Sequence, residues 1–244
     1  MQQENKRKPI VLVHGAWGGA WVWRRVLGPL RQAGHEVHAL TLTGDGDRSH
    51  LRHPDIRLSH HITDVVAAVR AEELKDVVLV GHSYGGMVVT GAADRLLQDD
   101  PAAVRTIVYV DAMVPLSGER WCDSHAPEVV AQRTASAQAN GGAFLPPSPD
   151  VFGLDEHDAQ WLQRRHVPHP FGPYLEPIHY DEARWRGLRK VFIDCTEPAF
   201  PTIAAMRDRV RRMDHFQVQE MATGHFPMIS QPARLVALLL EAAQ

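Results

Sequence analysis

The chain has 244 residues, of which 44% are hydrophobic and 23% are charged, and its formal net charge is -3. This composition is typical of one globular domain, alone or with an insertion, and it excludes a mostly disordered or fibrous chain. Nucleic acid and anionic membranes are not expected as partners, because the charges are balanced and form no long basic run. We therefore expect a small-molecule substrate, and the sequence leaves a homodimer open.

The two cysteines, Cys122 and Cys195, are far apart and lack a CxxC spacing, so we expect neither a disulfide framework nor a structural zinc site. The apolar run 10–13 that follows the polar start is too short for a signal peptide. The apolar run 235–240 is far shorter than the roughly 20 residues that span a bilayer. These features predict a cytoplasmic protein that needs no cofactor and no metal.

Short β-branched runs alternate with longer helical patterns, which is typical of crossover units in a parallel sheet. We predict six strands, at 10–13, 36–40, 77–80, 105–110, 190–194 and 216–220. Helices are predicted around the apolar positions 62, 65, 66 and 69, over 84–97 and over 232–243. The predicted fold class is therefore α/β, with a doubly wound, mainly parallel six-stranded sheet.

The stretch 115–201 departs from this alternation, since it holds 11 of the 17 prolines. So many prolines are incompatible with regular sheet, and the helical patterns within the stretch cover only 124–139 and 155–165. We interpret 115–187 as a helical cap inserted into a core made of 1–114 and 188–244. Three aromatic residues of this cap either line a substrate pocket or form the cap's own core: Trp161, Phe171 and Tyr174.

A G-x-S-x-G motif, Gly81 to Gly85, directly follows a predicted strand and precedes a predicted helix. In this context the motif is a nucleophile elbow, a sharp turn that lifts the serine hydroxyl above the sheet. Ser83 is therefore the candidate nucleophile. The alternative is a glycine-rich turn that serves packing alone.

A serine hydroxyl needs a positioned base, and in this fold the base follows late in the chain. His225 lies in the loop between the last predicted strand and the final helix, where catalytic groups of open α/β sheets gather. It is therefore the candidate base among the 15 histidines.

The glycine-rich loop 14–19 follows the first predicted strand and reaches the same sheet edge as the nucleophile. The backbone amides of Ala16 and Tyr84 are the candidate substrate-binding donors of an oxyanion hole. The nucleotide-binding patterns G-x-G-x-x-G and G-x-x-x-x-G-K-S/T are absent from this loop.

Three carboxylates compete for the acid that orients the histidine. Asp111 ends the fourth predicted strand, Asp194 is still within the fifth, and Glu197 lies on the turn that leaves the fifth. The order Ser, acid, His favours Glu197, because a side chain on that turn can reach over the sheet edge.

Together these motifs resemble the α/β-hydrolase superfamily, and within it the branch of plant methylesterases, hydroxynitrile lyases, methylketone synthase and bacterial esterases. The resemblance rests on Val11–Trp17 with Trp21 and Trp23, on Leu79–Val88 and on Tyr109–Pro115. It implies a triad acid at Glu197, where the family usually has Asp. Hydroxynitrile lyases place a lysine after the histidine, whereas Phe226 follows His225 here, so the resemblance argues against cyanohydrin cleavage.

We therefore expect a serine hydrolase that cleaves a small or medium carboxylic ester through an acyl-enzyme, with the triad Ser83, His225 and Glu197. Two alternatives use the same pocket. One is cofactor-independent lyase or decarboxylase chemistry with His225 as acid and base, and the other is a non-catalytic ligand receptor that keeps the hydrolase fold.

Overall fold

The computed structural model describes residues 7–244, and its main element is a six-stranded sheet in which every neighbouring pair of strands is parallel. The strand order is β2-β1-β3-β4-β7-β8. The strands are β1 (Ile10–Val13), β2 (Val37–Leu40), β3 (Val77–His82), β4 (Val104–Val110), β7 (Arg189–Cys195) and β8 (Phe216–Met221). The predicted fold class is confirmed, and the ends of each predicted strand lie within two residues of the ends of an observed strand.

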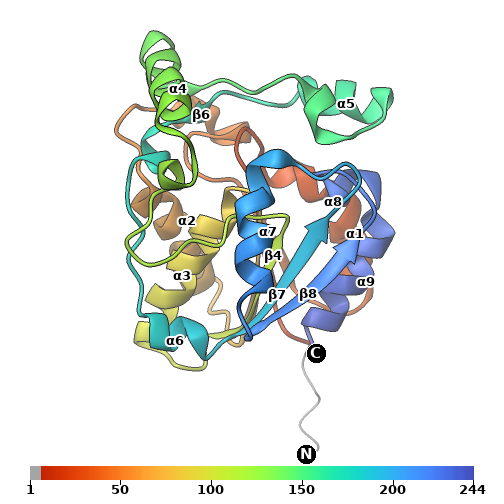
Figure 1. The fold of residues 1–244 in the computed structure, drawn as a ribbon. Helices are drawn as coiled ribbons and strands as arrows, with labels where there is room; N and C mark the ends of the chain where they lie inside the picture. The colour runs from red at the N-terminus through yellow and green to blue at the C-terminus, as the bar shows by residue number, and fades with distance from the viewer. Residues whose placement is uncertain (1–6) are drawn as a thin grey trace, which may run out of the picture.

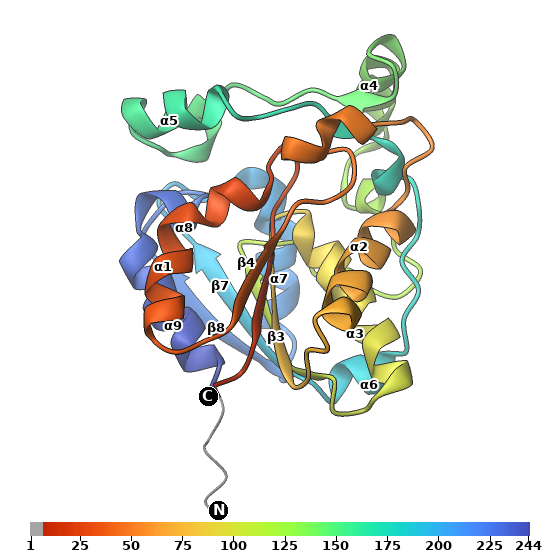
Figure 2. The same ribbon diagram turned by 180° about the vertical axis from the view of Figure 1, so that it is seen from behind.

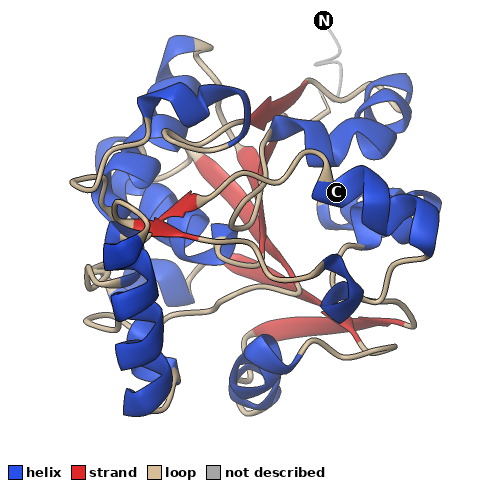
Figure 3. Cartoon of the chain, turned by 90° about the horizontal axis from the view of Figure 1, so that it is seen from above, coloured by secondary structure: helices blue, strands red, loops and turns tan. Residues whose placement is uncertain are grey.

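Helices cover both faces of this sheet (Figure 3). The helices are α1 (Arg24–Gln32), α2 (Leu58–Ala71), α3 (Gly85–Asp99), α4 (Pro127–Ala139), α5 (Glu156–Gln163), α6 (Glu182–Arg186), α7 (Ala204–Arg211), α8 (Pro227–Ser230) and α9 (Pro232–Ala242). Helices α1, α8 and α9 pack into one apolar cluster, and α2, α3 and α7 pack into another (Figure 2). The sheet is therefore doubly wound.

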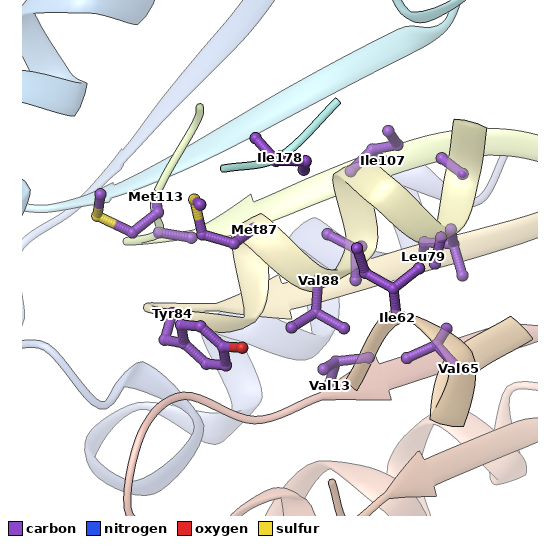
Figure 4. Close-up of a cluster of buried hydrophobic side chains, with 14 of the residues drawn as sticks. Val13, Ile62, Val65, Leu79, Tyr84, Met87, Val88, Ile107, Met113 and Ile178 are labelled. Atoms are coloured by element: carbon purple, nitrogen blue, oxygen red, sulfur yellow. The ribbon is translucent and has the colours of Figure 1, made fainter. Parts of the chain in front are cut away.

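Alternate residues of each strand point to opposite faces of the sheet, so each strand contributes side chains to both apolar clusters. In β1, Val11 and Val13 belong to the cluster of α2 and α3, while Ile10 and Leu12 belong to the cluster of α1 and α9. Figure 4 shows the first cluster, where Val88 of α3 packs above Val13. Because the central strands are buried on both faces, their sequences are almost continuously apolar.

The segment between β4 and β7 carries α4, α5 and α6. Figure 1 shows α4 and α5 beyond the carboxyl ends of the sheet strands, while α6 lies near their amino ends. The segment also contains a two-stranded antiparallel ladder of β5 (Ala143–Phe144) and β6 (His169–Pro170), which its proline content did not predict. Pro170 is tolerated because a two-residue edge strand leaves its nitrogen outside the ladder.

Hydrogen bonds join this segment to the rest of the chain at many places, and three of them use side chains of residues 17–45. The pairs are Arg25 with Asp158 (2.5 and 2.7 Å), Trp17 Nε1 with the Phe144 carbonyl oxygen (2.9 Å) and Asp45 with His169 (2.8 Å). Within residues 7–244, no helix has the length and apolarity needed to cross a membrane. Both cysteines, Cys122 and Cys195, are buried and free.

Candidate active site

The turn between β3 and α3 holds Ser83 in a strained conformation. Its φ is +53°, in the left-handed region that non-glycine residues rarely adopt. The flanking glycines permit close approach of the backbone: a Cβ at Gly81 would lie 2.6 Å from the Gly85 carbonyl oxygen, and one at Gly86 would lie 2.0 Å from that of Met113. The strand, turn and helix therefore have the geometry of a nucleophile elbow.

His225 lies between β8 and α8, and its imidazole faces the serine. The Nε2 atom is 3.0 Å from Ser83 Oγ, within hydrogen-bond distance. The ring is buried and packs against the rings of Phe200 and Phe152, at centroid distances of 4.2 and 5.9 Å. The Nε2–H of His82 donates to the backbone carbonyl of His225 (2.8 Å) and fixes the loop. The structure thus brings the predicted nucleophile and the predicted base within hydrogen-bond distance.

The acid bonded to this histidine is Asp111, and the expectation of Glu197 is wrong in this structure. His225 Nδ1 lies 2.6 Å from Asp111 Oδ2, and Asp111 is fully buried at the end of β4 with φ +40°. Glu197 is exposed, and its backbone N–H donates to the Thr223 carbonyl (3.0 Å). The reason is sheet order: β4 lies next to β3, so its end faces the His225 ring directly.

Asp194, the third candidate, takes part in a buried ion-pair network instead. Arg207 of α7 donates from Nη2 to Asp111 Oδ1 (2.6 Å) and from Nε to Asp194 Oδ1 (2.5 Å). Arg211 donates to the other oxygen of Asp194. Both oxygens of Asp111 therefore accept hydrogen bonds, one from His225 and one from Arg207, which fixes the carboxylate plane. The sequence did not indicate this role of Arg207, because an arginine in a short helix carries no signal of buried partners.

The two amides predicted as oxyanion donors flank the nucleophile. Neither the N–H of Ala16 nor that of Tyr84 donates a hydrogen bond to another group within residues 7–244. The loop that carries Ala16 lies directly against the serine, since a Cβ at Gly15 would be 2.7 Å from Ser83 Cβ. Both amides are therefore free to bind a ligand atom near Ser83.

Buried histidines surround the elbow and support it. Burial lowers the pKa of His61 to about 4, and the neutral ring donates from Nε2 to the Thr43 carbonyl and accepts at Nδ1 from the Tyr84 hydroxyl, at 2.9 Å each. Burial also raises the pKa of Asp45 to about 7 and lowers that of His169 to about 3, because the interior penalises charge on either group. These groups hold the Tyr84 side chain and the β6 strand in place.

A cavity of about 400 Å³ opens at Ser83 and has mostly apolar walls. Its lining includes Ala16, Trp17, Tyr84, Met113, Trp121, Arg133, Phe144, Tyr174, Phe200 and Ile203. Of the three aromatic residues left open by the sequence, Tyr174 lines this cavity. Trp161 packs edge-on against Trp21 instead, and Phe171 packs against Tyr174 and Phe144. A volume and lining of this kind suit a small, partly aromatic ligand.

Two groups of His and carboxylate side chains within residues 7–244 are spaced closely enough to hold a metal ion. They are Glu36, His38 and Glu72, and Asp155, His157 and Asp158. Neither group belongs to the cavity wall.

Comparison with known proteins shows the family. The sequence pattern of the alpha/beta hydrolase family matches residues 10–238. The carbendazim hydrolyzing esterase of Nocardioides sp. (strain SG-4G) is 36% identical over 242 residues, which cover 94% of this chain and 97% of that protein. Esterase PIR7B of Oryza sativa subsp. japonica is 38% identical over 266 residues, covering 98% of this chain and 97% of that protein.

A solved structure has the same fold. It is an extracellular alpha/beta-hydrolase from a Paenibacillus species, described as sharing structural and functional homology with tobacco salicylic acid binding protein 2. It superposes with a TM-score of 0.84 at 24% identity and covers 97% of this chain and 99% of its own. The predicted family resemblance is confirmed, and this chain belongs to the alpha/beta hydrolase family.

Proposed function

We propose that this carboxylic ester hydrolase works through a triad of Ser83, His225 and Asp111 and an acyl-enzyme intermediate. The observation that carries the proposal is the continuous chain of hydrogen bonds from Ser83 Oγ to His225 Nε2 (3.0 Å) and from His225 Nδ1 to Asp111 (2.6 Å). This arrangement supplies a nucleophile, a base and an orienting acid in the relation that acyl transfer requires.

The proposed steps assign one role to each of these groups. Asp111 accepts a hydrogen bond from the Nδ1–H of His225, which leaves Nε2 unprotonated and able to take the proton of Ser83 as its Oγ attacks the ester carbonyl. The free amides of Ala16 and Tyr84 stabilise the negative oxygen that forms. The alcohol leaves with the proton from His225, and a water molecule activated by the same nitrogen then releases the acid.

The cavity supports a small ester with a planar or aromatic acyl part. Trp17, Trp121 and Tyr174 present ring surfaces to a volume of about 400 Å³, which is in the range of pockets that hold drug-sized ligands. One relative is named for carbendazim hydrolysis, and others, such as methylesterase 3 of Arabidopsis thaliana (28% identical), are named methylesterases. We infer that the substrates are methyl esters of planar or aromatic acids, or methyl carbamates with a planar or aromatic group. We also infer that residues 115–187 act as the cap over the bound substrate.

The test is hydrolysis of p-nitrophenyl acetate and butyrate by the wild type and Ser83→Ala, with mass spectrometry after a fluorophosphonate probe. The substitution removes the nucleophile, so we expect kcat to fall by about 10⁴-fold or more and the probe adduct at Ser83 to disappear. Ser148→Ala, which removes an exposed hydroxyl, is the matched control and should change neither readout. Undiminished turnover by Ser83→Ala would refute the proposal.

A further inference from the structure

One charged side chain lies in the otherwise uncharged wall of the cavity. Arg133, from α4, lines the same cavity as Ser83. Its guanidinium carbon lies 4.8 Å from the ring centroid of Trp121 and 5.4 Å from that of Phe144. These aromatic faces favour the cation and restrict where it can move.

This guanidinium has no anionic partner in the part of the chain that the structure describes. Arg133 forms no ion pair with a carboxylate of residues 7–244, and its Nη1 is buried without a hydrogen-bond partner among them. Arg120, in the same segment, is different: it is exposed, and its Nη2 donates to Asp123 at 2.7 Å. Burial lowers the pKa of Arg133, but an arginine side chain keeps its proton in proteins.

Arg133 is half-buried, and leaving its buried Nη1 unpaired is costly, because buried donors normally have acceptors. A ligand that supplies an acceptor would remove this cost. The best acceptor for a guanidinium is a carboxylate, which takes two parallel N–H bonds from its planar fork. The cavity is therefore polarised, with the nucleophile on one part of its wall and a cation on another.

We propose that Arg133 is a substrate-binding residue that selects esters carrying a second, free carboxylate, such as the monomethyl esters of dicarboxylic acids. The free carboxylate binds the guanidinium, and the carbon skeleton lies against Trp121 and Phe144. The inference rests on the proposed function, because the ester group of the same molecule must reach Ser83.

The experiment compares matched anionic and neutral esters. The anionic set is monomethyl terephthalate, monomethyl isophthalate and the monomethyl esters of succinate through suberate, which vary the distance between ester and carboxylate. The neutral set is methyl p-toluate, methyl m-toluate and methyl alkanoates of equal length. The variants are Arg133→Met, which keeps an apolar side chain of similar length, Arg133→Lys, which keeps the charge, and Arg120→Met as the control for loss of one cap arginine.

For the best-fitting anionic esters, we expect kcat/KM of Arg133→Met to fall by about 10- to 100-fold, mainly through KM, as for a lost hydrogen bond to a charged group. The matched neutral esters should change by less than about threefold, and Arg133→Lys should retain part of the preference. Arg120→Met should resemble the wild type on both sets. An equal loss on both sets, or no loss, would overturn the proposal, since it would show Arg133 to be a packing residue.

A second readout is independent of catalysis. Binding of terephthalate can be followed by the fluorescence of Trp17 and Trp121, which line the cavity. We expect Arg133→Met to weaken this binding by about 10-fold or more, and Arg120→Met to leave it unchanged. Arg133-dependent binding in an enzyme that hydrolyses no ester would support the anion site while refuting the acyl-transfer function. Equal binding by both variants would overturn the anion site whatever the esterase activity.

Discussion

Replacing Asp111 by asparagine tests which carboxylate orients the base. The structure determines how the new amide must lie. Arg207 donates to Oδ1 at this position (2.6 Å), so the amide oxygen stays toward Arg207 and the NH₂ group turns toward His225. His225 Nδ1 must then accept a hydrogen bond, which places its proton on Nε2, where it faces Ser83 and cannot act as the base.

The expected size of the effect follows from this tautomer. An enforced wrong tautomer lowers kcat by about 10⁴-fold, which corresponds to about 5 kcal/mol in activation free energy. The folding cost should be smaller than the roughly 3–5 kcal/mol of a broken buried ion pair, because Arg207 keeps Asp194 (2.5 Å) and the carbonyls of Phe200 and Cys195. The variant should therefore fold and be nearly inactive.

The assay measures kcat for p-nitrophenyl butyrate together with the thermal unfolding midpoint, for Asp111→Asn and Glu197→Gln in parallel. Glu197 is exposed, so Glu197→Gln should keep kcat within about twofold of the wild type. The reasoning would be refuted by a folded Asp111→Asn that keeps kcat within tenfold, or by a loss in Glu197→Gln comparable to the one expected for Asp111→Asn.

Two further predictions concern stability. Gly86→Ala should lower the free energy of unfolding in urea by about 3 kcal/mol or more, because its Cβ would lie 2.0 Å from the Met113 carbonyl oxygen. Gly28→Ala should change it by less than about 1 kcal/mol, because helix propensity favours Ala but Pro29 follows, and equal effects of the two substitutions would contradict this steric account. His61 has a pKa of about 4 in the folded state against 6.5 unfolded, so the stability it contributes is complete above pH 6.5 and is lost as pH falls toward 4. Between pH 7 and pH 5 this loss is about 2 kcal/mol and should be absent in His61→Gln; an unchanged pH dependence in that variant would assign the loss to other groups.

The features that could be predicted from the sequence are those that depend on a short stretch of neighbouring residues. The six strands follow from short apolar runs that need helices on both faces, and the observed β1 and β3 are buried throughout. Ser83 and His225 were identified because each lies in a loop directly after a strand, and parallel strands deliver such loops to one sheet edge.

The carboxylate that hydrogen-bonds to His225 could not be identified from its position after a strand. Asp111 and Glu197 both follow strands that end at the same edge, and the choice between them depends on which one His225 Nδ1 faces after packing. Arg207 and Arg133 were missed for a related reason: their roles depend on partners or cavities supplied by distant segments. The β5–β6 ladder was missed because its strands are two residues long and contain a proline.

The use of Asp111 also affects the turn that follows β7. Both ring nitrogens of His225 are engaged by residues of other loops, so Glu197, the carboxylate of this turn, takes no part in the hydrogen bonds of the imidazole. What the turn contributes is shape, since Phe200, Pro201, Thr202 and Ile203 line the cavity and Phe200 stacks on the imidazole. Mutations in this turn can therefore change which molecules fit while leaving the proton-transfer groups intact, which makes it a region where evolution can alter specificity without first losing catalysis.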